Sequence, residues 1–183
     1  MYPTKNDIHE KDRGHLVELL NARLADAIDL QTQCKQAHWN VKGPDFIALH
    51  ELFDKLNEDV ETYVDDIAER AVQLGGIADG TSRSVAKRTS LPEYAAKSGA
   101  GRDHAEALSS ALAFFGKTVR QSINKSGELS DADTTDLFTE VSRGVDKWLW
   151  FVEAHLQAER YQHARRSPPT LTPTLSQLRW ARG

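Results

Sequence analysis

One long stretch with a helical repeat, from Phe46 to Leu74, constrains this chain more than any other part of it. Its apolar residues recur at steps of three and four, which indicates a single amphipathic helix. They are Phe46, Leu49, Phe53, Leu56, Val60, Tyr63, Ile67, Ala71 and Leu74. Such a helix must bury its apolar face against other helices, and no segment of the chain has the repeat of a β-strand. The sequence therefore predicts an all-α bundle.

A second stripe, made of polar residues, runs beside the apolar one on the same predicted helix. His50, Asp54, Asp65 and Glu69 are separated by 4, 11 and 4 residues. At about 100° per residue they fall within roughly 60° of one another on the helix surface. All four side chains can bind a metal ion. Any one of them alone is better explained as a solvated or ion-paired surface residue, so the metal hypothesis depends on their joint spacing.

The length of this helix separates the two halves of the stripe. Asp54 and Asp65 are about 16 Å apart at a rise of roughly 1.5 Å per residue, whereas metal ions that share ligands lie roughly 3.5–4 Å apart. If a second copy packs antiparallel about a two-fold axis, the His50 end of one helix meets the Glu69 end of the other. His38, just across the Gly43-Pro44 turn, is placed to complete the His50 and Asp54 half.

Three further helices follow from the same repeat. They are expected at residues 14–39, 102–126 and 130–161, with Gly127 ending the third and Ser130 and Asp133 capping the fourth, whose core face we extend to His155. The long connection at residues 75–101 carries a plausible short helix at residues 82–88. A connection of this length suits a four-helix bundle whose second and third helices run parallel, as in ferritin-like folds.

Composition and the two ends of the chain complete the domain prediction. Residues 1–13 form a predicted flexible arm, residues 14–161 the bundle, and residues 162–183 a disordered basic tail rich in Pro and Thr. The single Cys34 excludes an intrachain disulfide and suits a reducing cytoplasm. No segment reads as a signal peptide or a membrane span. The formal net charge of −4 argues against nucleic-acid binding by the whole surface.

The ligand pattern, with Trp39 directly after His38, resembles the ferroxidase signature of the Dps family, the miniferritins. The resemblance covers all five ligand positions and the segments HWNVKG, LHELFD and DDIAER, and the general helical similarity extends over residues 16–159. It implies a ferritin-like bundle that assembles from two-fold dimers into a hollow dodecamer. No Glu-x-x-His occurs in the chain, so the intrasubunit di-iron site of ordinary ferritins is not supported.

The resemblance also implies a chemistry. Two iron ions would bind at each inter-subunit site, with His38, His50 and Asp54 from one subunit and Asp65 and Glu69 from its mate. Fe(II) would be oxidised, preferentially by hydrogen peroxide, and stored as ferric mineral. Trp39 would donate electrons or quench radicals, although packing at an interface is an equally good role for it.

Two further groups of residues are candidates for contacts outside the ferroxidase site. Acidic residues near the start of the last helix resemble those that line three-fold pores in the family, through which iron would enter: Glu128, Asp131, Asp133 and Asp136. Favourable charge at a helix N-terminus is the simpler explanation for Asp131 and Asp133. The basic tail carries arginines that could bind DNA phosphates from many subunits at once: Arg165, Arg166, Arg179 and Arg182.

Two functional classes stay open from the sequence. The first is a cytoplasmic ferroxidase and iron store that protects DNA by removing Fe(II) and peroxide together. The second is a non-enzymatic nucleoid protein of the same fold that binds DNA through its basic C-terminal tail. The complete set of ligands favours the first. The N-terminal arm weakens the second, because its basic residues are offset by acidic ones. His9 and His15 could form an extra metal site, but isolated surface histidines are commoner.

Overall fold

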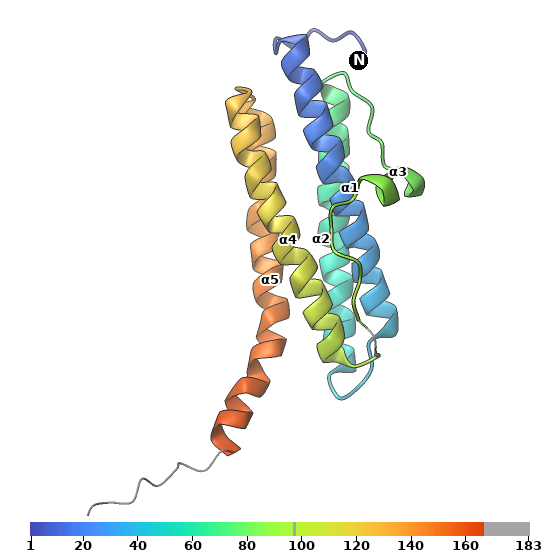
Figure 1. Cartoon of the computed structure of the whole chain (residues 1–183), viewed down its shortest axis with the longest axis vertical. Coiled ribbons are helices and arrows are strands. Elements are labelled where there is room, and N and C mark those ends of the chain that lie inside the picture. The colour runs from blue at the N-terminus through green and yellow to red at the C-terminus, as the bar shows by residue number, and fades with distance from the viewer. Residues whose placement is uncertain (97, 167–183) are drawn as a thin grey trace, which may run out of the picture.

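The computed structural model describes residues 1–96 and 98–166, and within them all regular structure is helical (Figure 1). Four long helices form the bundle: α1 (Glu10–Asn40), α2 (Phe46–Gln73), α4 (Gly101–Glu128) and α5 (Ala132–Arg166). The short α3 (Ser82–Arg88) lies in the connection between α2 and α4, where the sequence places it. The predicted all-α ferritin-like bundle with one long crossover is confirmed.

The helices pair as their connections require. A short turn joins α1 to α2 and another joins α4 to α5, so each pair is antiparallel, and packing within these pairs is the most extensive in the molecule (Figure 1). The crossover runs along the side of the α1 and α2 pair before entering α4. This long connection brings the chain back to the end of the bundle where α2 began.

The core runs the length of the bundle and consists of the predicted apolar stripes. Its largest fully buried side chains are Phe53, Phe115 and Phe138, surrounded by leucines of α1, α2 and α4. Burying a side chain of this size stabilises the fold by roughly 1.5–3 kcal/mol. On α5 the predicted stripe is buried at Val141, Val145, Trp148 and Val152. Its two ends differ from the prediction, because Phe138 is buried rather than Leu137 and His155 is exposed.

Helix boundaries differ from the predictions at several ends. α1 begins at Glu10 rather than Gly14, and the backbone N–H of Tyr2 donates a hydrogen bond to the Gly75 carbonyl, so the first residues lie against the end of α2. α4 continues through Gly127 to Glu128, and α5 extends to Arg166 rather than ending near residue 161. Gly75 follows α2 with φ of 83°, as expected of a glycine after a helix C-terminus.

The cap of α5 is Asp131 rather than Ser130. Ser130 has φ of 57° and turns the chain, whereas the Asp131 carboxylate accepts a hydrogen bond from the Thr134 N–H at 3.2 Å.

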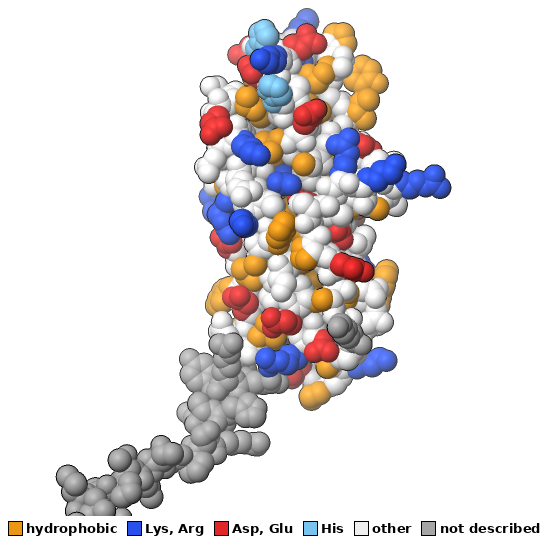
Figure 2. Space-filling view, in the orientation of Figure 1, with side chains coloured by type: hydrophobic (Ala, Val, Ile, Leu, Met, Phe, Trp, Pro, Cys, Tyr) orange, Lys and Arg blue, Asp and Glu red, His pale blue; other side chains and the backbone are white. Residues whose placement is uncertain are grey.

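None of the described helices is long and apolar enough to cross a membrane. On the face shown in Figure 2, acidic and basic side chains are intermixed rather than segregated.

Candidate metal centre

Two histidines face each other across the turn that joins α1 to α2. His38 lies in the last turn of α1 and His50 in the second turn of α2. Their rings stack with centroids 3.7 Å apart. The Nδ1 of each ring is 2.9 Å from the backbone carbonyl oxygen of the other residue.

This reciprocal arrangement determines the tautomer of both rings. A carbonyl oxygen can only accept a hydrogen bond, so each Nδ1 carries the hydrogen and donates it. The lone pair of a neutral imidazole is then on Nε2 in both rings. Metal-binding histidines characteristically donate their second ring N–H to a backbone carbonyl or a carboxylate, which fixes the ring. Each ring of the pair thus keeps its Nε2 available as a possible nitrogen ligand.

Asp54 adds a carboxylate one turn further along α2. Its Oδ1 is 3.8 Å from the His38 Nδ1 and 2.6 Å from the Lys35 ammonium nitrogen. The hydrogen bond from Lys35 lowers the pKa of Asp54; burial opposes this, and the nearby His38 and His50 add to it. The carboxylate is therefore ionised near neutral pH, as a metal ligand must be. Lys35, one turn before His38 on α1, thus pairs with a carboxylate of the candidate site.

Asp65 and Glu69 are not brought to this cluster. Both lie exposed on α2, and Asp65 is eleven residues beyond Asp54, about 16 Å along a straight helix. Among residues 1–96 and 98–166, no three His, Cys, Asp or Glu side chains are grouped so that they could hold a metal ion. Within one chain the structure thus shows two separate halves of the predicted ligand set.

Apolar side chains lie unusually exposed around the histidine pair. Trp39, Phe46 and Ile47 are 68%, 39% and 60% exposed, and the Phe46 ring centroid is 5.1 Å from that of His50. Beside them is a cavity of ≈ 1020 Å³ between α1, α2 and the crossover, which Trp39 and Lys35 line together with Asn57, Glu61 and Tyr94.

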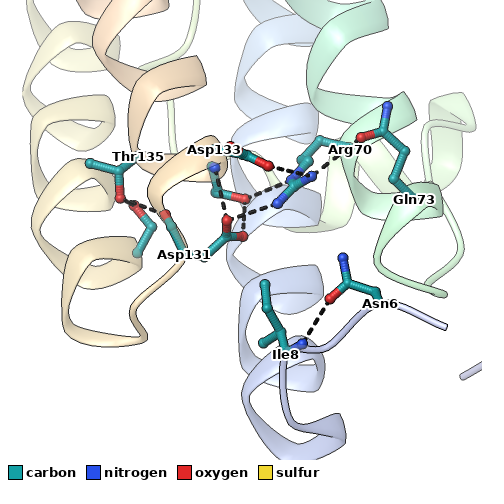
Figure 3. A network of polar contacts seen from close by, with 9 residues as sticks. Asn6, Ile8, Arg70, Gln73, Asp131, Asp133 and Thr135 are labelled. Carbon is teal, nitrogen blue, oxygen red and sulfur yellow. Dashed lines mark hydrogen bonds and ion pairs between the residues drawn. The ribbon is translucent and has the colours of Figure 1, made fainter. Parts of the chain in front are cut away.

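The acidic residues predicted to line a pore separate into two kinds. Asp131 is buried and bound to Arg70 at 2.7 Å, with a further hydrogen bond from the Thr134 hydroxyl (Figure 3). It is therefore committed to the join between α2 and α5, and its carboxylate does not face solvent. Glu128, Asp133 and Asp136 remain exposed. Asp133 and Asp136 share a pocket of ≈ 410 Å³ with Glu69.

Arg70 was not singled out from the sequence. Its role depends on the approach of two segments that are 61 residues apart, and the only signal in the sequence is a basic residue among the apolar positions of α2.

The arginines proposed to bind DNA are not placed. Arg179 and Arg182 lie outside the described residues, and of Arg165 and Arg166 only the helical backbone is described.

Comparisons with known proteins identify the family of this fold. Residues 17–161 match the family model of the ferritin-like domain. The DNA protection during starvation protein of Agrobacterium fabrum is 43% identical over 156 residues, covering 85% of this chain and 96% of that protein.

Solved structures show the same relationship. The structure of Mycobacterium smegmatis Dps superposes with a TM-score of 0.81 at 32% identity, covering 85% of this chain and 94% of that one. DpsA14 from Streptomyces coelicolor gives a TM-score of 0.80 at 34% identity, with coverage of 85% and 91%. The ligand spacing, the helical bundle and these similarities together show that the chain belongs to the Dps family of ferritin-like proteins.

Proposed function

We propose that this protein oxidises Fe(II) with hydrogen peroxide at centres shared between two subunits and stores the ferric product inside a hollow shell of twelve. The observation that carries the proposal is the reciprocal hydrogen bonding of His38 and His50. It orients two imidazole rings beside the ionised carboxylate of Asp54. A histidine pair kept for packing alone would not need both rings held in the tautomer that leaves Nε2 free.

The donor set suits iron as the substrate. Imidazole and carboxylate ligands favour iron, manganese or zinc, whereas thiolates, which select copper(I) or iron–sulfur clusters, are lacking near the cluster. The single cysteine, Cys34, is fully buried in the core. Lys35 holds Asp54 in place before iron binds, and a cation that binds Asp54 must compete with this ion pair.

The inter-subunit arrangement follows from the two separated halves of the ligand set. Asp65 and Glu69 have the charge to complete the coordination but lie too far along the same helix. An antiparallel two-fold contact between two copies of α2 brings the halves together twice, which gives two identical centres per dimer. It would also cover Trp39, Phe46 and Ile47, whose exposure is typical of an interaction surface.

Iron would enter the shell past the exposed carboxylates at the join of α4 and α5. Glu128, Asp133 and Asp136 can concentrate cations by their combined field. Asp131 is omitted from this group because Arg70 neutralises it.

Protection of DNA follows from the chemistry without contact to DNA. The name of the Agrobacterium fabrum relative describes DNA protection during starvation. If Fe(II) and peroxide are consumed together, fewer hydroxyl radicals form, and nearby DNA benefits. This role does not require the basic tail.

The decisive experiment is complementation between two inactive variants. One variant carries His50→Ala and Asp54→Ala, and the other carries Asp65→Ala and Glu69→Ala. A mixed dimer contains one centre with every mutation and one centre with none. Random pairing after co-refolding or co-expression would therefore restore roughly one quarter of the centres. Stopped-flow absorbance after mixing with Fe(II) and peroxide measures the recovery.

Three outcomes decide the proposal. Each variant alone should oxidise Fe(II) no faster than the buffer blank, and the mixture should recover about a quarter of the wild-type rate. A mixture as inactive as its parents, although mixed dimers are demonstrated by mass spectrometry, would refute shared centres. A wild-type protein no faster than the blank would refute the ferroxidase function altogether.

A further inference from the structure

The crossover places a tyrosine against a buried histidine, away from the cluster of His38, His50 and Asp54. The Tyr94 hydroxyl is 2.5 Å from Nδ1 of His104, which lies in the first turn of α4. The His104 side chain is buried, with 2% of the residue exposed. Its Nε2 is also buried and has no hydrogen-bond partner within residues 1–96 and 98–166.

The surroundings of the pair determine which atom holds the proton. Burial raises the pKa of Tyr94, and the nearby Cys34 raises it further, so the phenol is protonated. Burial lowers the pKa of His104, although the Asn40 backbone and Asp103 oppose this effect. The ring is therefore neutral near pH 7, and the Tyr94 O–H donates to Nδ1. The same Asn40 and Asp103 groups would stabilise the ring once it gained a proton.

We propose that Tyr94 and His104 form a redox-active pair. A one-electron oxidant takes an electron from Tyr94, which becomes a neutral tyrosyl radical. A phenol that loses an electron becomes a strong acid, so its oxidation is favoured where a base already accepts its proton. In the proposed step the electron leaves Tyr94 for the oxidant and the phenolic proton moves to Nδ1 of His104. The products of this step are the tyrosyl radical, the imidazolium ion of His104 and the reduced oxidant.

The oxidant is the hydroxyl radical, which forms when Fe(II) reduces hydrogen peroxide by one electron, and which becomes hydroxide on capturing the electron. A later Fe(II) returns an electron to the tyrosyl radical and becomes Fe(III), while the imidazolium returns the proton. The pair is thereby restored, and one damaging radical has been converted into one further oxidised iron. The source of oxidant rests on the proposed function; the redox chemistry of the pair does not.

The position of Tyr94 suits this role. It lines the ≈ 1020 Å³ cavity together with Lys35 and Trp39. Lys35 is bound to Asp54, and Trp39 directly follows His38, so this cavity begins at the candidate metal centre. Tyr94 and His104 both line a second, smaller cavity of ≈ 290 Å³. The phenol therefore lies between the expected source of radicals and the base that accepts its proton.

Tyr63 provides a matched control within the same chain. It is also half-buried, and burial, with contributions from Asp59 and Glu140, raises its pKa to about 12. Among the described residues, no histidine contacts the Tyr63 ring or hydrogen-bonds to its hydroxyl. Burial is thus shared by the two tyrosines, and the proton acceptor distinguishes them.

The test uses the full chain without iron. A photo-generated ruthenium(III) complex oxidises the protein at pH 7, and rapid freezing followed by electron paramagnetic resonance detects the radical. Wild type and Tyr63→Phe should give the same tyrosyl signal, with a coupling to one exchangeable proton that disappears in D₂O. Tyr94→Phe should lose this signal. His104→Gln should form it roughly 10²-fold more slowly, the lower end of what a positioned base contributes.

Retention of the signal in Tyr94→Phe would overturn the proposal, as would equally fast formation in His104→Gln or His104→Asn. Circular dichroism verifies that each variant is folded.

A second arm uses Fe(II) with limiting peroxide and a spin trap for hydroxyl radical. Tyr94→Phe should release more trapped radical than wild type while oxidising iron at the same rate; equal release would overturn the protective role. Failure of iron oxidation in wild type would refute the proposed function and leave the first arm decisive for the pair.

Discussion

The ion pair that joins the end of α2 to the start of α5 gives the sharpest stability prediction. The Arg70 guanidinium donates to Asp131 at 2.7 Å, to the Thr134 hydroxyl at 3.0 Å and to the Gln73 side chain at 3.3 Å (Figure 3). Asp133 also lies 3.7 Å away but is 84% exposed. Arg70 and Asp131 are themselves 8% and 2% exposed.

Asp131→Asn removes the negative charge of this side chain but keeps its ability to cap α5. Asparagine caps a helix about as well as aspartate, so the hydrogen bond to the Thr134 N–H can persist while Arg70 loses its buried counter-charge. Breaking a buried pair by removing one partner costs about 3–5 kcal/mol. The remaining contacts of Arg70 favour the lower end, about 3 kcal/mol. For a chain of this size that corresponds to a fall in Tm of roughly 6–12 °C.

Calorimetry at matched protein concentration measures this change, since association also contributes to the apparent stability. Burial would raise the pKa of Asp131, but the hydrogen bonds from Thr134 and Arg70 outweigh it and lower the pKa overall. A lowered folded-state pKa means that the stabilisation is complete above the unfolded value of about 3.9. It is lost as the pH falls through the folded value. The difference in Tm between wild type and Asp131→Asn should therefore shrink below about pH 4.

The control is Asp146→Asn, which removes one partner of the exposed pair Arg120–Asp146. These side chains are 49% and 56% exposed and 2.9 Å apart, so the change should cost at most about 1 kcal/mol. The variant Arg70→Met with Asp131→Asn should recover part of the loss, because no unpaired charge remains. An Asp131→Asn protein as stable as the Asp146→Asn control would refute the reasoning.

Two further predictions concern the glycines and the cysteine. Gly75→Ala should destabilise the fold by more than about 1 kcal/mol, because φ is positive and the new Cβ would lie 2.6 Å from the Tyr2 carbonyl oxygen. Gly14→Ala should stabilise the fold by about 0.5–1 kcal/mol, since this helical position has nothing within 4 Å of the new Cβ. Urea unfolding measures the free energy of unfolding of both variants, and equal changes in the two would contradict the argument. Burial raises the pKa of the Cys34 thiol, so an aromatic disulfide reagent should label it only after unfolding, and rapid labelling of the native protein would contradict its burial.

The sequence alone determined the helices and the spacing of the side chains that are proposed to bind metal. The repeat of 3.6 residues places Phe53 and Ile67 in the core wherever the partner helices lie, because periodicity is a local property of one helix. The same local geometry, with its fixed rise per residue, separates Asp54 from Asp65. That distance was sufficient to predict that one chain cannot bring the two halves of the proposed ligand set together.

Tertiary structure decided which polar groups meet. The pairing of Arg70 with Asp131, of Lys35 with Asp54 and of Tyr94 with His104 joins residues that are 61, 19 and 10 positions apart. It depends on how the helices and the crossover pack. Ser130 illustrates the limit: its residue type suits a cap, yet the turn holds it at positive φ and the carboxylate of Asp131 takes the role. Helical periodicity is encoded along the chain, whereas a hydrogen bond between distant side chains forms only after the core has set their positions.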